Sequence, residues 1–284
     1  MKKHENQLNI ERLCLLAGVS RSGYYAWLHR GESARDRANR SLLVGITAGY
    51  HESRQTYGAI RIHRELEAQG TSCGRHRVAR LMRKSGLRSV HRRKYRPQTT
   101  QSKHGLSLAK NIVDQDFKAS KPNQKWGGDI TYVPTAEGWL YVSILLDFHS
   151  RKVVGLATGS SLHAELCCRA LKQACALRQP PAELIHHSDR GVQYASQAYR
   201  DVLQQHRFIQ SMSRKGNCYD NAMVESFFHT LKVELTHRKR YQTREEARRD
   251  IEDYIYNFYN AKRRHSSLDY RSPNEYEFIN QFAA

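Results

Sequence analysis

Residues 122–238 carry the pattern that most restricts how this chain can fold. Three runs rich in β-branched and aromatic residues, GGDITYV, GWLYVSILLDF and KVVGLAT, follow one another with only short turn segments between them. Helical and strand patterns then alternate. They comprise a helix at 163–177, a strand at 183–189, a helix at 194–206, a strand at 208–213 and a helix after residue 221. This order predicts an α/β fold in which a mixed sheet is flanked by helices.

Two aspartates lie within or at the end of these expected strands. Asp129 is in the middle of GGDITYV, and Asp189 ends the strand that reads ELIHHSD. An aspartate in a strand has low propensity and a desolvation cost, so its presence there needs a reason. Open α/β sheets bind ligands at such strand ends. A hydrogen-bonded or turn-forming aspartate is the structural alternative for either residue alone.

A third acid, Glu225, lies on the helix that follows the loop GNCYDN. The expected buried stripe of that helix comprises Val224, Phe227, Phe228, Leu231 and Leu235. Glu225, His229 and Lys232 share a separate polar face. With Asn221 at the N-cap, Glu225 is one residue beyond the capping-box position, so capping is assigned to Asp220 or Asn221. Three carboxylates from two strands and a helix suit Mg²⁺ or Mn²⁺, and two such ions support in-line phosphoryl transfer.

The charge of the chain is concentrated in its first part. The net charge is +20, and residues 1–121 hold 25 Lys/Arg and 9 Asp/Glu, a net of +16. Residues 122–284 hold 22 basic and 18 acidic residues, a net of +4. This asymmetry indicates a polyanionic partner, most simply nucleic acid. A merely solubilising surface is the alternative.

The basic first part has the pattern of two helix-turn-helix units. Residues 10–28 have this cadence, with Ser20 as the expected N-cap of the second helix. A second cycle ends in a helix at 74–85, which Thr71 and Ser72 are expected to cap. On that helix Val78, Leu81 and Met82 face one way, opposite a basic face. The basic face comprises His76, Arg80, Arg83 and Lys84. Such a face suits contact with DNA, although a solvated surface would look similar.

Residues 91–121 are polar and lack a sustained period, which indicates a linker. Its start forms a basic strap for phosphates that includes Arg92, Arg93 and Lys94. The longest apolar run, 139–148, is too short to span a bilayer, and the N-terminus lacks a signal-peptide pattern. We therefore expect a cytoplasmic protein without a membrane partner. The six cysteines form no CxxC pair, so we expect reduced thiols and no zinc site.

Three segments resemble a known family. WGGDITYV, HHSDRGVQYAS and SMSRKGNCYDNAMVESFFHTLKVEL are similar to the catalytic segments of IS-three-type insertion-sequence transposases, in their OrfB product. These enzymes belong to the DDE transposase and retroviral-integrase superfamily. The 35 residues between Asp189 and Glu225 agree with that pattern. The N-terminal segment YGAIRIHRELEAQG and the tail YNFYNAKRRHSSLDYRSPNEYE also resemble the family, except that Asp269 stands where glycine is expected.

The resemblance implies an RNase H-like core in which Asp129, Asp189 and Glu225 are catalytic and hold two Mg²⁺ (or Mn²⁺) ions. The ions would activate water or a DNA 3′-OH for attack on a phosphodiester. The expected DNA contacts outside the basic first part are Lys232, Asn217, Tyr219, Arg263 and Arg264. The expected partners are terminal inverted repeats, target DNA, further copies of the chain on DNA, and an OrfA protein or fusion.

The expected organisation has five parts. These are a helix-turn-helix at 1–45, a second at 46–95, a linker at 96–121, the catalytic core at 122–238, and a C-terminal helix and basic tail at 239–284. Three other functions remain open from the residues. A tyrosine recombinase would use Tyr219 or Tyr270 with Arg263, Arg264 and His265. A DNA-binding regulator would have an inactive core, and a host RNase H-type nuclease would not need the basic front.

Overall fold

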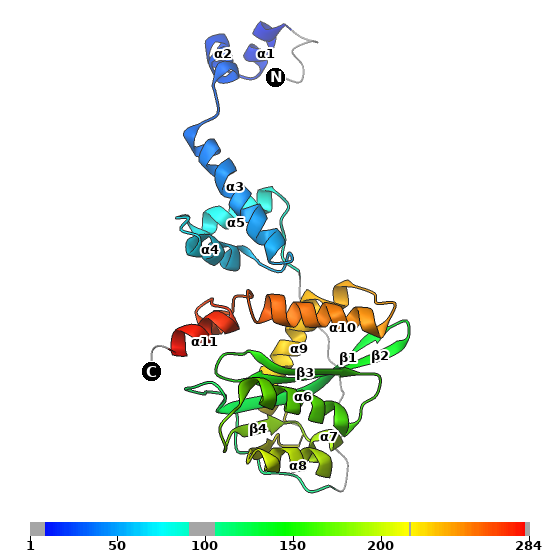
Figure 1. Cartoon of the computed structure of the whole chain (residues 1–284). Coiled ribbons are helices and arrows are strands. Elements are labelled where there is room, and N and C mark those ends of the chain that lie inside the picture. Colours follow the sequence, from blue (N-terminus) through cyan, green and yellow to red (C-terminus); the bar gives the residue numbers. More distant parts are fainter. Residues whose placement is uncertain (1–8, 91–105, 216, 282–284) are drawn as a thin grey trace.

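The computed structural model describes residues 9–90, 106–215 and 217–281. An all-helical front part precedes a five-stranded sheet with helices around it (Figure 1). The front part contains α1 (Ile10–Leu16), α2 (Arg21–His29), α3 (Ala34–Glu52), α4 (Ala59–Ala68) and α5 (Arg75–Lys84). The sheet part contains β1 (Lys125–Thr135), β2 (Gly138–Asp147), β3 (Val153–Gly159), α6 (Ala164–Arg178), β4 (Ile185–Ser188), α7 (Val192–Ala195), α8 (Gln197–Gln205), β5 (Ile209–Met212), η2 (Cys218–Asn221) and α9 (Ala222–Glu234). The C-terminal part contains η3 (Thr236–Arg238), α10 (Arg244–Asp253), the π-helical η4 (Tyr254–Tyr259), η5 (Ser266–Leu268) and α11 (Pro273–Gln281).

The sheet is mixed, as the sequence pattern predicts. Its strand order is β3-β2-β1-β4-β5. The first three strands form an antiparallel meander, and β4 and β5 run parallel to β1. The helix expected at 194–206 is divided into α7 and α8 at Ser196, whose side chain accepts a hydrogen bond from the Tyr199 amide and so starts a new helix.

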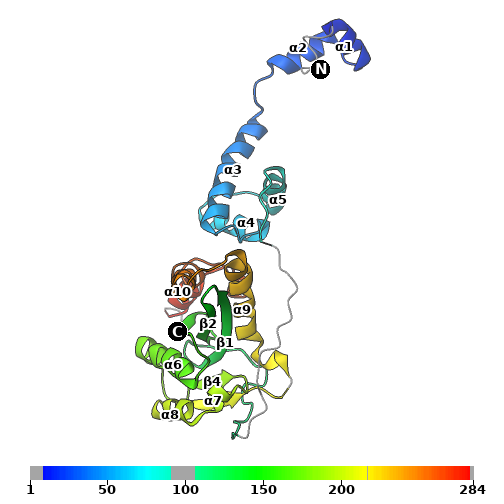
Figure 2. The same cartoon turned by 90° about the vertical axis from the view of Figure 1, so that its right-hand side faces the viewer.

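Side chains alternate between the two faces of the sheet, and helices cover both. The even-numbered positions of β2, such as Val142 and Ile144, pack into one apolar cluster with residues of α9, α10 and η4. Leu145, the residue after Ile144, packs with α6 and α8 on the other face. Figures 1 and 2 show α9 and α10 on the side of the sheet part that is nearer to α3–α5. The sheet is therefore the middle layer of three.

Helices α3–α5 pack around apolar side chains that belong to the same cluster as the α9 face of the sheet. Ile46, Ile62, Leu66, Val78 and Met82 are buried and belong to one apolar cluster. The boundary expected between residues 45 and 46 falls within α3, which is continuous from Ala34 to Glu52. Three helices of this kind give the basic face of α5 a fixed support.

The two expected helix caps of the front part have different outcomes. The Ser20 side chain accepts a hydrogen bond from the Gly23 amide at 3.0 Å, which confirms it as the N-cap of α2. The expected cap of α5 by Thr71 and Ser72 is wrong. That helix begins after Gly74 and has no side-chain cap, because the loop continues two residues past Ser72.

The C-terminal part packs on the sheet part. Arg263 and Glu234 form a buried ion pair, with Arg263 Nε 2.8 Å from Glu234 Oε2 and Arg263 Nη2 2.7 Å from Glu234 Oε1. The buried Tyr254 hydroxyl donates a hydrogen bond to the same carboxylate at 2.7 Å. These contacts join the end of α9 to η4 and to the segment that follows it.

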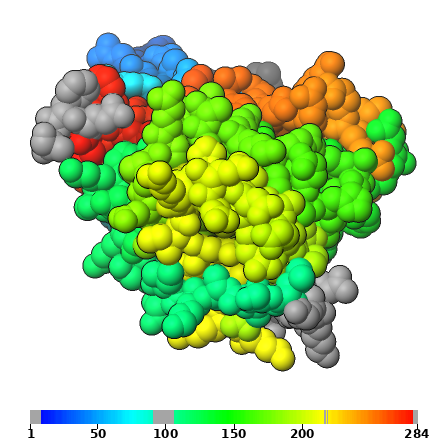
Figure 3. All heavy atoms as spheres, turned by 60° about the horizontal axis from the view of Figure 1, so that its bottom comes forward, coloured from blue at the N-terminus to red at the C-terminus, as the bar shows by residue number. Residues whose placement is uncertain are grey.

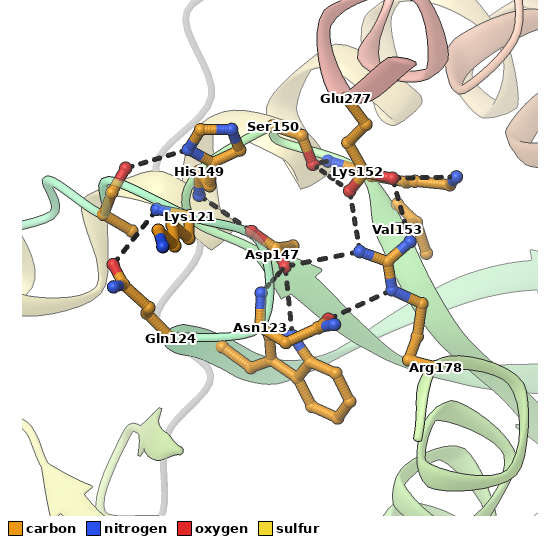
Figure 4. Close-up of polar contacts among 12 residues, drawn as sticks. Lys121, Asn123, Gln124, Asp147, His149, Ser150, Lys152, Val153, Arg178 and Glu277 are labelled. Atoms are coloured by element: carbon orange, nitrogen blue, oxygen red, sulfur yellow. Dashed lines mark hydrogen bonds and ion pairs between the residues drawn. The ribbon is translucent and has the colours of Figure 1, made fainter. Parts of the chain in front are cut away.

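A second polar network anchors α11 (Figure 4). Glu277 accepts hydrogen bonds from both guanidinium ends of Arg178 on α6, at 2.8 and 2.9 Å. It also accepts from Ser150 and Lys152, which precede β3. These cations hold the pKa of Glu277 below its usual value although burial opposes them. The last helix is thus part of the core assembly, and not a separate tail.

The helical front part contacts the C-terminal part directly. Arg54 pairs with Asp253 at 2.7 Å, and Arg264 pairs with Glu65 at 2.6 Å. The Arg264 amide donates to the Tyr57 hydroxyl at 2.7 Å. These contacts fix α3–α5 relative to the sheet. Within the described ranges no helix is long and apolar enough to cross a membrane.

Candidate active site

The register of β1 and β4 brings two of the three acids together. These strands are parallel, and their last paired positions are Gly128 and Ser188. Asp129 and Asp189 each follow directly, so they leave the pairing at the same sheet edge. The Asp129 Oδ1 atom accepts from the Ile130 amide at 2.7 Å, and Asp189 Oδ1 accepts from the Gly191 amide at 2.9 Å. Both carboxylates line one cavity.

Helix α9 brings the third acid close because β1 has a glycine where the helix crosses it. A Cβ atom at Gly127 would lie 2.6 Å from Val224 Cγ2 and 2.5 Å from Phe148 Cε1. No side chain fits there, so the backbone of β1 contacts α9 directly. Val224 and Phe227 are buried against the sheet, as expected from the periodicity. Glu225 is next to Val224 and is held beside β1 by this packing.

We expect Gly127→Val to displace α9 and to abolish activity. The added Cβ atom alone would lie within 2.6 Å of Val224 and Phe148, and overpacking of this kind costs about 1–3 kcal/mol of unfolding free energy. Thermal unfolding and strand transfer check this. Gly49→Ala in α3 is the control, because its Cβ would meet Ile62 and Glu65 at 3.6 and 3.7 Å, which is ordinary van der Waals contact. Equal loss of activity in both variants would contradict the proposed role of Gly127.

The charges of the three acids shift the pKa values of Asp129 and Glu225, as neighbouring carboxylates in one site do. Burial, followed by repulsion from Asp189 and Glu225, raises the pKa of Asp129 well above its usual value. Burial and the charge of Asp189 raise the pKa of Glu225. Burial lowers the pKa of Lys232, while Asp129 opposes that shift. Asp129 is thus within electrostatic reach of Asp189, Glu225 and Lys232, and Glu225 is within reach of Asp189.

Asn221 precedes α9 but does not cap it with its side chain. It occupies the N-cap position without a side-chain cap bond, and its Nδ2 donates instead to Asp129 Oδ2 at 3.0 Å. Its Oδ1 atom is buried without a hydrogen-bond partner among the described residues. The capping role expected for Asn221 is thus corrected. The Asn221 side chain orients Asp129 through its Nδ2 donor, while the Oδ1 atom that a cap would use accepts no hydrogen bond from the helix amides.

Asp220 is not a cap either, and the sequence pattern gives no sign of its role in the fold. Its buried carboxylate accepts two hydrogen bonds from the Arg214 side chain, at 3.0 and 2.8 Å, and one from the Arg214 amide. Asn111 and Gln115 donate to it at 3.0 and 3.1 Å. These donors, led by Arg214, hold the pKa of Asp220 well below its usual value. In Figure 3 the segment around residue 111 (teal) lies beside yellow residues of this loop. Asp220 therefore fixes the start of α9.

The two histidines before Asp189 support the site from inside. Burial lowers the pKa of His186 to about 3 and that of His187 to about 4, so both rings are neutral at pH 7. His186 Nε2 is 2.8 Å from the Tyr199 hydroxyl, and His187 Nδ1 is 2.9 Å from Ser211 Oγ. They link β4 to α8 and β5. Asp189 therefore follows a strand that side-chain hydrogen bonds tie to α8 and to β5.

Asp129 and Asp189 offer the kind of oxygen donors that a divalent cation takes. No group of three or more His, Cys, Asp or Glu side chains in the described part of the chain is close enough to hold one ion. Asp129 and Asp189 nevertheless share a cavity, and Glu225 is near enough for Asp189 to raise its pKa. Hard oxygen donors that repel one another are the ligands that Mg²⁺ or Mn²⁺ satisfies. Glu225 would have to move closer to join the two aspartates on one ion.

The other expected DNA contacts fall into separate groups. The basic face of α5 is exposed along its length, at His76, Arg80, Arg83 and Lys84. Tyr219 is 70% exposed, and Asn217 accepts a hydrogen bond from its amide at 3.0 Å. Arg92, Arg93 and Lys94 lie outside the described residues.

The structure pairs Arg263 and Arg264 with acids of the protein, which argues against the expectation that they contact DNA. The Arg263 side chain is 6% exposed, and its guanidinium group donates two hydrogen bonds to the carboxylate of Glu234. Arg264 is 13% exposed and pairs with Glu65. Both guanidinium groups are used within the protein, which sequence spacing alone does not reveal because their partners are distant along the chain.

Comparison with known families agrees with this arrangement. The HTH-like domain family matches residues 36–95. Two families described as integrase core domain match residues 119–218 and 225–280. A helix-turn-helix-like domain followed by an integrase core defines the class of DNA-recombining proteins to which such chains belong.

Curated relatives narrow the class. The chain is 42% identical over 279 residues to transposase InsF for insertion sequence IS3A of Escherichia coli (strain K12), covering 98% of this chain and 96% of that protein. It is 44% identical over 273 residues to the insertion element IS600 uncharacterized 31 kDa protein of Shigella sonnei, covering 96% of this chain and 100% of the relative. The chain belongs to the IS3 family of insertion-sequence transposases, which supports a role in DNA transposition or integration.

The similarity to solved structures is more distant. The HTLV-2 integrase catalytic core domain in complex with magnesium has 15% identity and a TM-score of 0.45, over 56% of this chain and 99% of that one. A simian T-cell lymphotropic virus intasome in complex with PP2A regulatory subunit B56 gamma has 15% identity and a TM-score of 0.48, over 78% of this chain and 74% of that one.

Proposed function

We propose that this protein binds the terminal inverted repeats of its insertion sequence and catalyses Mg²⁺-dependent DNA cleavage and strand transfer. The observation that carries the proposal is the meeting of Asp129 and Asp189 at one sheet edge, with Glu225 on the adjoining helix. The relationship to insertion-sequence transposases over nearly the whole chain supports it.

Each group near the edge has a role in this proposal. Asp129, Asp189 and Glu225 would hold two Mg²⁺ or Mn²⁺ ions through their carboxylate oxygens. Such ions, when bound, activate water or a DNA 3′-OH and neutralise charge on the leaving oxygen. Asn221 keeps Asp129 oriented through its hydrogen bond. Lys232, beside Asp129, supplies positive charge for a phosphate of the bound strand.

The stereochemistry of strand joining tests this function. A target phosphate labelled as one phosphorothioate diastereomer is inverted if a 3′-OH displaces the leaving group in a single step. Two displacements through a tyrosine adduct retain the configuration. We expect inversion. Retention would contradict the proposal and support the recombinase alternative, while binding without any joining would support a regulator with an inactive core.

The surroundings of Tyr270 favour the single-step route. A tyrosine recombinase needs exposed cations around the phosphate, yet Arg263 pairs with Glu234 and Arg264 with Glu65. Burial and the neighbouring arginines hold the pKa of His265 well below its usual value, so that ring carries no positive charge at pH 7. These three residues therefore do not form an exposed phosphate-activating set.

We propose that the basic face of α5 binds DNA phosphates. His76, Arg77 and Arg80 of α5 also line a cavity of about 580 Å³, to which α3 contributes Arg35. Arg77 Nε donates to Asn39 Oδ1 at 2.8 Å, which fixes α5 on α3. An exposed row of cations on a fixed helix suits the DNA backbone.

Arg80→Ala with Arg83→Ala is expected to weaken DNA binding by the full-length protein and to reduce its salt dependence. The slope of log K against log[salt] should fall by about 1 for each arginine that contacts a phosphate. Fluorescence anisotropy over a salt series measures this. Arg248→Ala, whose guanidinium is paired with Glu245 and Glu252, is the matched control. An unchanged slope in the double variant would exclude this face.

Paired element ends require more than one active site, so we propose that several copies assemble on DNA. An OrfA protein, separate or fused, would add further contacts with the ends. We place the protein in the bacterial cytoplasm, at the nucleoid where its DNA substrate lies.

A further inference from the structure

The cavity beside the two aspartates has an aromatic wall that carboxylate chemistry alone does not explain. Its volume is about 380 Å³, within the range of ~300–1,000 Å³ typical of pockets for small organic groups. Besides Asp129 and Asp189, its lining includes Tyr132, Trp139, Tyr141, Leu162 and Tyr194. Metal ions and phosphates are bound by oxygen donors and cations. An aromatic wall next to them indicates a flat apolar group in the ligand.

The position of the wall follows from the strand register. β4 pairs with β1 only as far as Gly128, so β1 extends beyond the end of β4 from Asp129 onward. Beyond that point Tyr132 is opposite Tyr141 in the antiparallel pair with β2. Trp139, the second residue of β2, is opposite Pro134, two positions further along the same face. The hairpin thus carries its aromatic side chains past the end of β4, next to the acids.

Trp139 has both the exposure and the fixed orientation of a stacking surface. Its side chain is 47% exposed although it is a large aromatic residue. Its ring is 4.8 Å from that of Tyr132, centroid to centroid, at an interplanar angle of 80°, which is a favourable edge-to-face contact. Its carbonyl oxygen accepts a hydrogen bond from Arg244 Nε at 3.0 Å. The indole is therefore held in place with part of its surface open.

A cation adjoins the same wall. Lys232 Nζ is 5.5 Å from the centre of the Tyr132 ring, within the range of cation–π contacts. A nucleotide combines a flat base with a negatively charged phosphate. The aromatic wall offers a surface for the base, and Lys232 offers a positive charge for the phosphate. Both lie beside the carboxylates that would act on the phosphodiester.

We propose that this cavity receives one unstacked nucleobase of the DNA strand whose phosphate lies at Asp129 and Asp189. Trp139 stacks on the base, and Tyr132 holds the Trp139 ring and the Lys232 ammonium group in position. The inference rests on the proposed function, because it takes the acids as the place where a DNA strand is held. Stacking of a base on an aromatic ring does not depend on which base it is. We therefore expect the site to bind a nucleotide that carries any base more tightly than an abasic one.

The test compares a short oligo(dA) with a chain of the same length made of abasic deoxyribose phosphates, without divalent metal. Trp139→Ala in the full-length protein should weaken oligo(dA) binding by about 10-fold. The same variant should bind the abasic chain as the unmodified protein does. Trp139→Phe, which keeps a smaller ring, should lose less. Phe278→Ala removes another exposed aromatic side chain, on α11, and should change neither affinity.

Tryptophan emission gives a second readout that does not depend on affinity at other sites. The chain has three tryptophans, of which Trp126 is fully buried. In a Trp27→Phe background, Trp139 is the exposed one, and oligo(dA) should quench it while the abasic chain should not. Equal quenching by both chains, or equal loss of affinity for both in Trp139→Ala, would overturn the base site.

Failure of the base site and failure of the proposed function give different results. Normal strand transfer together with no base-dependent quenching rejects the base site alone. Base-dependent quenching in a protein that never joins strands rejects the proposed catalysis and supports a single-strand binding site at Trp139.

Discussion

Glu225→Gln is expected to lower strand cleavage and joining by on the order of 10³-fold while DNA binding is retained. The substitution keeps the size of the side chain but removes one negative oxygen donor from the set around Asp129 and Asp189. Burial and Asp189 already raise the pKa of Glu225, so loss of this charge relieves repulsion in the metal-free protein. Thermal stability without metal should therefore be equal to or above that of the unmodified protein.

Glu165→Gln provides the matched control for this variant. Glu165 is an exposed acid in the first turn of α6, so its loss should leave cleavage, joining and DNA binding unchanged. Single-turnover cleavage of end-containing DNA in Mg²⁺ and binding in its absence separate chemistry from recognition. Strand transfer by Glu225→Gln at an undiminished rate would show that Glu225 is not a ligand.

Arg263→Ala is expected to destabilise the protein by about 3–5 kcal/mol of unfolding free energy. The substitution leaves Glu234 in the protein interior with only the Tyr254 hydroxyl as a hydrogen-bond donor of the original set. An uncompensated buried carboxylate is costly, whereas an exposed pair contributes about 0–1 kcal/mol. Chemical denaturation followed by circular dichroism measures the difference.

Two further variants make the stability prediction specific. Arg249→Ala removes an exposed arginine, 75% accessible and paired with Glu245, and should change the unfolding free energy by less than about 1 kcal/mol. Arg263→Met combined with Glu234→Leu removes both buried charges and should recover much of the stability. If Arg263→Ala instead kept full stability and lost DNA affinity, the sequence-based interpretation of Arg263 as a DNA contact would be correct.

Local patterns were sufficient to predict the sheet and the buried side of α9. Alternation and β-branched residues marked the strands, and the spacing of Val224, Phe227 and Phe228 marked the face that is buried. Asp129 and Asp189 were identifiable because aspartate is unusual at such strand positions. The two aspartates lie close together because β1 and β4 pair in parallel. The expected order of elements is compatible with this pairing, and the register of the two strands establishes it.

Long-range partners were not predictable from local patterns. Asn221 has the sequence context of a helix cap, yet Asp129, 92 positions away, takes its amide hydrogen bond. Arg263 belongs to a run of basic residues that resembles a DNA-binding tail, yet Glu234 meets it in the interior. In each case a buried acceptor elsewhere in the fold decides the direction of the side chain, because burial without a partner is costly.

The central claim is that Asp129, Asp189 and Glu225 together hold the divalent ions of a strand-transfer reaction. Anomalous diffraction from crystals of the protein bound to DNA and Mn²⁺ tests it most directly. We predict Mn²⁺ within about 2.0–2.6 Å of carboxylate oxygens from both aspartates, with Glu225 as a further ligand. Full Mn²⁺ occupancy elsewhere in an active complex, with none at Asp129 and Asp189, would contradict the account.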